Sequence, residues 1–218
     1  MLRIKQFIFN PVCVNTYVVS DDSGEGVIID CGCAEGREWQ ELDGYLKANN
    51  IKVVHLLNTH LHLDHVFGNQ FAIPALGLKP EASAQDYPLY ANLRSQVAMF
   101  FGERIADSLN YDYTLQLGPS LHDGDEVKFG NTTLKVIATP GHTPGGLCFY
   151  DEADHILFSG DTLFQGSIGR TDLEGGNYAT LIRSVVNRLK VLPDDTKVYS
   201  GHGGMTTIGY EKDYNPYL

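Results

Sequence analysis

The chain is most constrained by one short segment, in which four metal-binding side chains follow an apolar run. The segment reads Thr59-His60-Leu61-His62-Leu63-Asp64-His65. It comes directly after residues 53–57, whose mostly apolar character predicts a buried strand. In an extended chain alternate side chains share a face, so His60 and His62 point the same way. Asp64 and His65 are adjacent in the chain, so their side chains point the same way only if the chain turns. We therefore expect them to bind a second metal ion beside the first.

Three loops elsewhere in the chain each carry one further metal-binding residue. His142 lies in the Pro/Gly-rich loop 139–146, and Asp161 and His202 each follow a glycine. All three come after apolar, strand-like runs. Because functional sites are commonly built from loops at strand ends, we expect these residues to join the 59–65 segment at one metal site.

The remaining histidines serve as a comparison. His55 lies inside an apolar strand and is expected to be a hydrogen-bonded core residue, while His122 and His155 lie in turns and are expected to be solvated. A phosphate-binding glycine loop and a Gly-x-Ser-x-Gly nucleophile motif are both absent from the sequence, which disfavours nucleotide binding and serine hydrolase chemistry.

Strand-like and helix-like segments recur in both halves of the chain. Strands are predicted at 2–9, 14–20, 26–30, 52–57, 127–129, 133–138, 146–150, 155–158 and 197–199, and helices at 35–49, from 65–71, within 83–101 and at 178–189. Residues 100–102 are expected to form a loop near the site. The mixed order of strands and helices predicts an α/β protein with two mixed β-sheets packed face to face and helices outside.

Composition narrows the class of protein. The 218 residues are expected to form a single domain, 1–218. The net charge is −11 and lysine and arginine form no cluster, which disfavours nucleic-acid and anionic-membrane partners. We see neither a membrane-spanning apolar run nor a signal peptide, and the four cysteines lack Cys-x-x-Cys spacing, so we expect reduced thiols and a cytoplasmic location.

The ordered motifs resemble those of the metallo-β-lactamase fold superfamily. The motifs are Thr-His-x-His-x-Asp-His at 59–65, then Gly-His at 141–142, Gly-Asp-Thr at 160–162 and Gly-His at 201–202. Residues 159–164, 166–170 and 201–209 are similar to the short bacterial form of glyoxalase II, a hydroxyacylglutathione hydrolase. The resemblance implies an αβ/βα four-layer sandwich with the site at one edge of the two sheets.

The resemblance also implies a set of ligands for two divalent metal ions. One ion would be held by His60, His62 and His142, the other by Asp64, His65 and His202, with Asp161 and a water bridging them. Zinc is expected, with iron or manganese as alternatives. An aspartate at the bridging position, where the β-lactamases carry cysteine or serine, disfavours antibiotic hydrolysis as the main activity.

The implied activity is hydrolysis of a small-molecule thioester or ester, of the S-lactoylglutathione type. A bridging hydroxide would attack the carbonyl, and Asp64 would accept a proton as the catalytic residue. Asp30 and Thr59 are expected to orient the ligand histidines.

The sequence leaves two alternative functions open. Persulfide dioxygenases of the same superfamily use one iron, held by the equivalents of His60, His142 and Asp161, and a metal-dependent nuclease is disfavoured by the acidic charge. Only residues 203–218 follow His202, so the basic C-terminal region that binds glutathione in longer enzymes is expected to be missing. The substrate tail, the native metal and the oligomeric state are not specified by the sequence.

Overall fold

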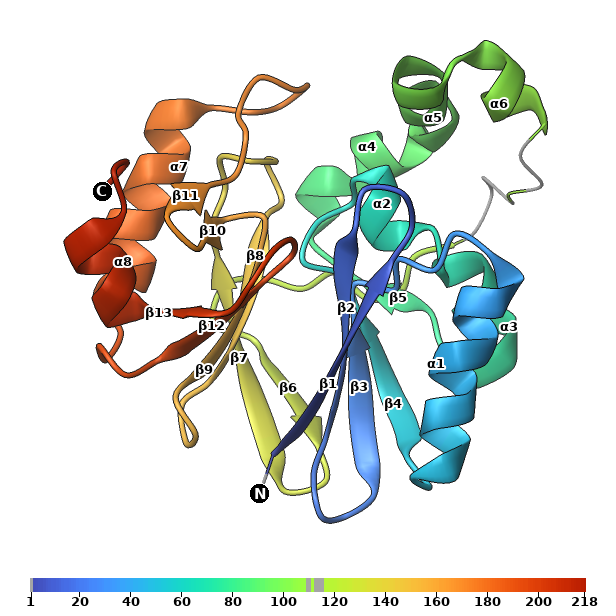
Figure 1. The fold of residues 1–218 in the computed structure, drawn as a ribbon, viewed down its shortest axis with the longest axis horizontal. Helices are drawn as coiled ribbons and strands as arrows, with labels where there is room; N and C mark the ends of the chain where they lie inside the picture. Colours follow the sequence, from blue (N-terminus) through green and yellow to red (C-terminus); the bar gives the residue numbers. More distant parts are fainter. Residues whose placement is uncertain (1, 109–110, 112–115) are drawn as a thin grey trace.

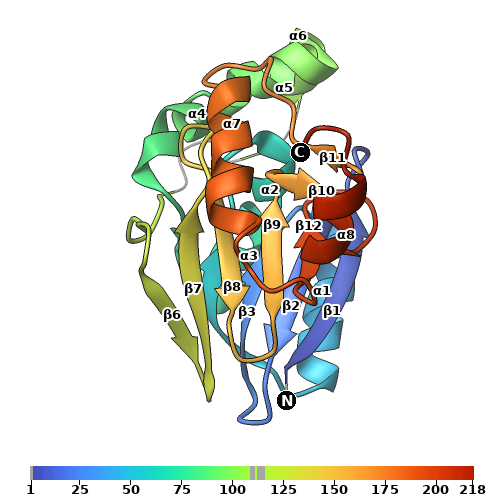
Figure 2. The same ribbon diagram turned by 90° about the vertical axis from the view of Figure 1, so that its left-hand side faces the viewer.

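The computed structural model describes residues 2–108, 111 and 116–218 of the chain. Within these residues, two β-sheets pack face to face and helices cover both outer sides (Figures 1 and 2). The expected α/β sandwich of two mixed sheets is therefore confirmed.

The first sheet has five strands, in the order in which they occur in the chain. They are β1 (Arg3–Phe9), β2 (Val14–Ser20), β3 (Glu25–Ile29), β4 (Lys52–Leu57) and β5 (Pro80–Glu81). The first three pair antiparallel, while β3, β4 and β5 pair parallel. Parallel strands need a crossover connection. The helices α1 (Gly36–Ala48) and α3 (Asn69–Leu76) lie in these crossovers and on the outer side of the sheet (Figure 1).

The second sheet has six strands in the order β13-β12-β9-β8-β7-β6. Its strands are β6 (Glu126–Phe129), β7 (Thr132–Ala138), β8 (Leu147–Asp151), β9 (Ile156–Gly160), β12 (Lys197–Ser200) and β13 (Thr206–Thr207). A separate hairpin is formed by β10 (Leu163–Phe164) and β11 (Ser167–Ile168). The outer side is covered by α7 (Tyr178–Ser184), the π-helical turn η2 (Val185–Leu189) and α8 (Ile208–Tyr214) (Figure 2).

The main core lies between the two sheets. Tyr17 and Phe158 meet there with ring centroids 5.3 Å apart, and Phe149 is fully buried beside them. On the outer face of the first sheet, Leu42 and Leu46 of α1 are buried one turn apart, as the helical spacing predicts.

A group of short helices lies at the end of the sandwich that is uppermost in Figure 1. These are α2 (Leu63–Val66), the 3₁₀ turn η1 (Ala84–Asp86), α4 (Tyr87–Ala91), α5 (Leu93–Phe101) and α6 (Glu103–Ser108). Apolar side chains of α2, α4, α5 and α6 form one cluster, which also includes Leu61 of the preceding loop. None of the helices in the described part of the chain combines the length and apolarity needed to cross a membrane.

Three sequence predictions of local structure were wrong in detail. The helix expected from 65–71 is two helices, because Gly68 N donates to the carbonyl of Cys31 at 2.8 Å. The helix expected at 178–189 is α-helical only to Ser184, and the bond from Lys190 N to Val185 O gives its last turn a π-helical form. Residues 100 and 101 form the end of α5 and not a loop.

Candidate metal centre

All seven residues predicted to bind metal meet at one end of the sandwich, the end at which α2 and β10 lie in Figure 1. His60 and His62 lie in the loop after β4, Asp64 and His65 in α2, His142 between β7 and β8, Asp161 after β9 and His202 after β12. Within the described residues they form three overlapping groups of three, with the donor atoms of each group within 4.8 Å of one another.

His60, His62 and His142 make up the first group of donors. Nε2 of His142 lies 2.9 Å from Nδ1 of His62 and 3.2 Å from Nε2 of His60. Nitrogen ligands of one tetrahedral zinc ion, each at 2.0–2.1 Å from the metal, lie about 3.3 Å apart. The three ring nitrogens therefore converge at close to the spacing that one metal ion requires.

The other ring nitrogens of His60 and His142 are held by hydrogen bonds. Nδ1 of His142 donates to the carbonyl of Arg170 at 2.7 Å. Because the Thr59 hydroxyl donates to Oδ2 of Asp30 at 2.7 Å, its oxygen accepts from Nδ1 of His60 at 3.1 Å. Both contacts place the proton on Nδ1 and leave the lone pair on Nε2 free for a metal.

Asp64, His65 and His202 make up the second group. Oδ2 of Asp64 lies 3.2 Å from Nε2 of His202 and 3.5 Å from Nε2 of His65. Nδ1 of His65 donates to Oδ2 of Asp30 at 2.9 Å, which leaves the lone pair of His65 on Nε2. Asp30 also accepts from the backbone N–H of Thr59 at 2.7 Å. The carboxylate of Asp30 thus orients one ring directly and, through Thr59, a ring of the first group.

Asp161 lies between the two groups. Its Oδ1 is 3.4 Å from Nε2 of His65, while its Oδ2 is 3.5 Å from Nε2 of His142 and 3.7 Å from Nε2 of His202. One carboxylate therefore presents an oxygen to each group.

Two buried polar atoms at this centre have no hydrogen-bond partner among the described residues. They are Nε2 of His65 and Oδ1 of Asp161. Leaving such atoms unsatisfied costs about 1–3 kcal/mol each. Divalent cations between the imidazole and carboxylate donors would satisfy both atoms, and zinc, iron and manganese all accept this type of donor. The residues present therefore fit a metal centre.

The protonation states also favour metal binding. Burial, with the charges of neighbouring histidines, lowers the pKa of His60 far below its usual value and that of His62 to about 3. These rings are neutral at physiological pH, as metal ligands must be. Burial raises the pKa of Asp64 and Asp161, but the neighbouring histidines, His65 foremost, together outweigh it and hold both pKa values below the usual range. Both carboxylates are therefore ionised. In turn the carboxylates around His65 and His202 outweigh burial and raise the pKa of both rings, so a metal ion that binds at their Nε2 atoms would displace a proton.

Asp86, a buried carboxylate at the end of η1, was not among the residues predicted from the sequence. It accepts hydrogen bonds from the Leu61 backbone at 3.3 Å, the Thr143 hydroxyl at 2.8 Å and the Gly145 backbone at 2.6 Å. A Cβ on Gly145 would lie 2.7 Å from Cγ of Asp86, so only glycine fits there. Asp86 thereby joins the loop of His60 and His62 to the loop of His142. The local pattern Ser83-Ala-Gln-Asp86 indicates only a helix start, and no ligand spacing links Asp86 to the histidines.

Strand β2 holds the loop of His202, a contact that the sequence also did not reveal. Nδ2 of Asn15 donates to the carbonyls of Ser200 at 2.9 Å and Gly203 at 3.0 Å, and the Tyr17 hydroxyl donates to Ser200 O at 2.7 Å. The loop belongs to the second sheet, whereas β2 belongs to the first. The position of His202 therefore depends on the packing of one sheet against the other.

The centre opens into a cavity of about 480 Å³. Beyond the donors, its lining includes Val12, Phe100, Phe101, Phe164, Ile168 and Arg170. This combination of an apolar wall with a few polar groups is typical of a small-molecule site. The expected loop at 100–102 is helical, but its two phenylalanines do lie beside the site.

The other histidines lie away from the centre. His55 is only partly buried, which corrects the prediction of a core residue: Nδ1 donates to Glu81 at 2.6 Å and Nε2 to the carbonyl of Lys128 at 3.1 Å. His122 and His155 lie at the surface, against Asp125 and Asp195. The four cysteines are free thiols, three of them buried.

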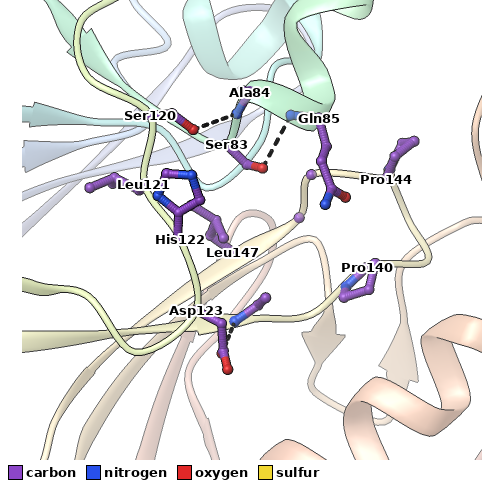
Figure 3. Close-up of a pocket in the computed structure, with 13 residues that line it drawn as sticks. Ser83, Ala84, Gln85, Ser120, Leu121, His122, Asp123, Pro140, Pro144 and Leu147 are labelled. Atoms are coloured by element: carbon purple, nitrogen blue, oxygen red, sulfur yellow. Dashed lines mark hydrogen bonds between the residues drawn. The ribbon is translucent and has the colours of Figure 1, made fainter.

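A separate cavity of about 300 Å³ contains none of the seven donors (Figure 3). Its polar groups bond to nearby backbone: Ser120 accepts from Ala84 N, Ser83 from Gln85 N and Asp123 from Ala138 N. These oxygens serve local structure, so the cavity is not a candidate for the reaction site.

Comparison with known proteins finds a matching family model, similar sequences and similar structures. The family model described as Metallo-beta-lactamase superfamily matches residues 10–202. The hydroxyacylglutathione hydrolase GloC of Haemophilus influenzae is 36% identical, over 94% of this chain and 92% of that protein. Among solved structures, the BLEG-1 B3 metallo-beta-lactamase has a TM-score of 0.85 at 32% identity, over 99% of both chains. TTHA1623 in a di-iron-bound form has a TM-score of 0.83 at 33% identity, over 98% of this chain and 100% of that one.

Proposed function

The chain belongs to the metallo-beta-lactamase superfamily, and we propose that it is a metal-dependent thioester or ester hydrolase of the glyoxalase II type, formed as one domain by residues 1–218. The observation that carries this proposal is the position of Asp161, whose carboxylate lies within 3.5 Å of a ring nitrogen of each group of donors. A carboxylate placed in this way suits two metal ions held close together.

The proposed ligands follow the two groups. His60, His62 and His142 would hold one ion, and Asp64, His65 and His202 the other, with Asp161 shared between them. Zinc is the proposed metal, because imidazole and carboxylate oxygen are its ordinary ligands. Iron and manganese accept the same donors, and the similar chain in a di-iron-bound form makes iron the first alternative to test.

Bound ions would supply a nucleophile at neutral pH and positive charge for the oxyanion that develops on the carbonyl. The chain supplies the remaining functions. The ionised carboxylate of Asp64 faces the cavity beside His202 and is the proposed proton acceptor. Asp30 and Thr59 hold the ring protons on Nδ1 of His65 and His60, so that in the neutral rings the lone pair lies on Nε2.

The substrate class rests on the relatives and the site together. The GloC protein, a hydroxyacylglutathione hydrolase, supports a thioester. The cavity of about 480 Å³ accommodates the carbonyl of a small molecule. We propose a small-molecule substrate, and the buried free thiols suit a reducing, cytoplasmic compartment.

The proposal is tested by metal analysis paired with activity on protein purified without chelator. We expect close to two metals per chain and hydrolysis of S-lactoylglutathione or a simpler thioester. The Asp161→Ala variant should lose nearly all turnover and at least one metal. Control reactions contain nitrocefin, for β-lactam cleavage, and glutathione persulfide, with oxygen uptake recorded. One iron per chain with persulfide-dependent oxygen uptake, and no thioester cleavage, would replace the hydrolase proposal by the dioxygenase.

A further inference from the structure

A second cavity adjoins the candidate metal centre, between α5 and residues 172–174. Its volume is about 330 Å³, at the lower end of the range for small-molecule sites. Four residues line both this cavity and the cavity over the donors: His62, Gln96, Phe100 and Leu173. A molecule whose carbonyl lies at the metal centre therefore meets the second cavity directly beside His62.

One face of α5 forms a wall of this cavity. Ser95, Gln96, Met99 and Phe100 line it, at the spacing of three and four residues that places side chains on one side of a helix. The adjoining side, which carries Leu93 and Val97, is buried in the apolar cluster beneath. One face of the helix therefore packs in the core, and the other face lines the cavity.

The wall is tied to the metal-binding loop by Gln96. Its side-chain oxygen accepts from the backbone N–H of Leu63 at 3.1 Å, and its amide donates to the carbonyl of Leu89 at 2.8 Å. Leu63 stands between His62 and Asp64. The cavity wall and the metal donors are therefore held in one hydrogen-bonded arrangement.

Two large apolar side chains of this wall are exposed. Met99 is 75% exposed and Phe100 is 46% exposed. Met99 therefore contributes little burial to the fold, and adjacent exposed apolar side chains beside a reaction site are typical of ligand contacts.

The charges around the cavity are acidic. Asp172 and Glu174 line it, and none of the described lining residues is a lysine or an arginine. The nearest cation of the neighbouring cavity, Arg170, is held by Asp172 through two hydrogen bonds of 2.7 and 2.8 Å. Asp172 and Arg170 compensate each other, so an anionic group entering here would meet the carboxylate of Glu174, with no further lysine or arginine among the described lining residues of the two cavities.

We propose that this second cavity, the arm pocket, holds an uncharged apolar arm of a thioester or ester whose carbonyl lies at the metal centre. The arm is either the acyl chain or the thiol or alcohol portion, since both extend from the same carbonyl. This inference rests on the proposed hydrolase function and adds the chemical class of the substrate.

The test uses two series of thioesters with the metal-loaded protein. In one series the acyl chain grows from acetyl to hexanoyl on N-acetylcysteamine, and in the other the acyl group stays acetyl while the thiol grows from ethyl to hexyl. We expect kcat/KM to rise along one series by about fourfold for each methylene, which is about 0.8 kcal/mol. Replacing the end of the best chain by a carboxylate should lower kcat/KM at least tenfold.

Variants test whether the dependence of kcat/KM on chain length arises in the arm pocket. Met99→Glu and Ser95→Trp, which charge or fill the cavity, should flatten the chain-length dependence while the metal content stays at the wild-type value. Glu174→Gln should raise kcat/KM for the carboxylate-ended substrate several-fold. Val191→Glu is the matched control, because Val191 is 71% exposed and lies outside both cavities, and it should leave both series unchanged.

The outcomes separate the two proposals. No cleavage of any thioester would overturn the hydrolase function itself. Cleavage with kcat/KM flat or falling in both series, or a preference for carboxylate-ended arms over apolar ones, would overturn only the arm pocket. A chain-length dependence that survives both Met99→Glu and Ser95→Trp would place the arm elsewhere and also overturn it.

Discussion

Oδ2 of Asp30 accepts a hydrogen bond from Nδ1 of His65 at 2.9 Å, and both side chains are buried. The same carboxylate receives the backbone N–H and the hydroxyl of Thr59. Asp30, which is not one of the seven donors, thus determines which nitrogen of the neutral His65 ring carries the proton.

Asp30→Asn should weaken metal binding roughly 10–100-fold. The amide of asparagine can donate to Nδ1, which favours the tautomer with its proton on Nε2, where the lone pair is needed. Zinc affinity is measured by competition with a chelating dye. Asp213→Asn, at an exposed carboxylate of α8 that lines neither cavity, is the control. An Asp30→Asn affinity equal to that of wild type would show that Asp30 does not set the tautomer.

Asp86→Ala should lower both stability and turnover, because three donors on two loops lose their acceptor. We expect a loss of about 3 kcal/mol in the free energy of unfolding, measured by urea denaturation. Asp86→Asn, which keeps one carbonyl oxygen, should recover most of the stability but less of kcat/KM. Equal recovery of both quantities would mean that Asp86 acts only on the fold.

Gly201→Ala should remove most activity and reduce metal content. A Cβ at this position would lie 2.2 Å from Oδ1 of Asp161 and 2.7 Å from Cε1 of His65, so the loop must shift away from the centre. Gly44→Ala is the control in α1, where a Cβ meets nothing within 4 Å. The control should gain about 0.5–1 kcal/mol in stability and keep full activity. A fully active Gly201→Ala enzyme with wild-type metal content would refute the close approach.

The His55–Glu81 pair predicts a pH-dependent contribution to stability. The hydrogen bond to Glu81 outweighs partial burial and raises the pKa of His55. The contribution, about 1 kcal/mol for a partly exposed pair, is therefore complete below pH of about 6.5 and is lost as the pH rises through the raised pKa. The difference in unfolding free energy between wild type and His55→Gln, measured from pH 5 to 9, should shrink as the pH rises. Turnover per bound metal should not change, and a difference that grows with pH would contradict the assignment.

The sequence motifs identified the superfamily by their resemblance to it. Their spacing and their position after strands predicted that the seven donors lie together. His60 and His62 are separated by one residue, and His142, Asp161 and His202 each follow an apolar strand. These local patterns were enough to predict that the residues belong to one site. The nine predicted strands were located closely, since alternation and turn residues are local signals, whereas the two-residue strands β5, β10, β11 and β13 were not predicted. Helix ends were less accurate, because Gly68 and Lys190 form their decisive hydrogen bonds outside the regular helical pattern.

The sequence by itself thus determined the class of chemistry, the two-sheet architecture and the residues that meet at its edge. Only the tertiary structure decided how those residues are held and what lies beside them. Asp86 acts on loops 25 and 59 residues away, and Asn15 on a loop 185 residues away. The arm pocket combines α5 with residues 172–174. Contacts of this kind depend on the packing of one sheet against the other, and no local pattern records them.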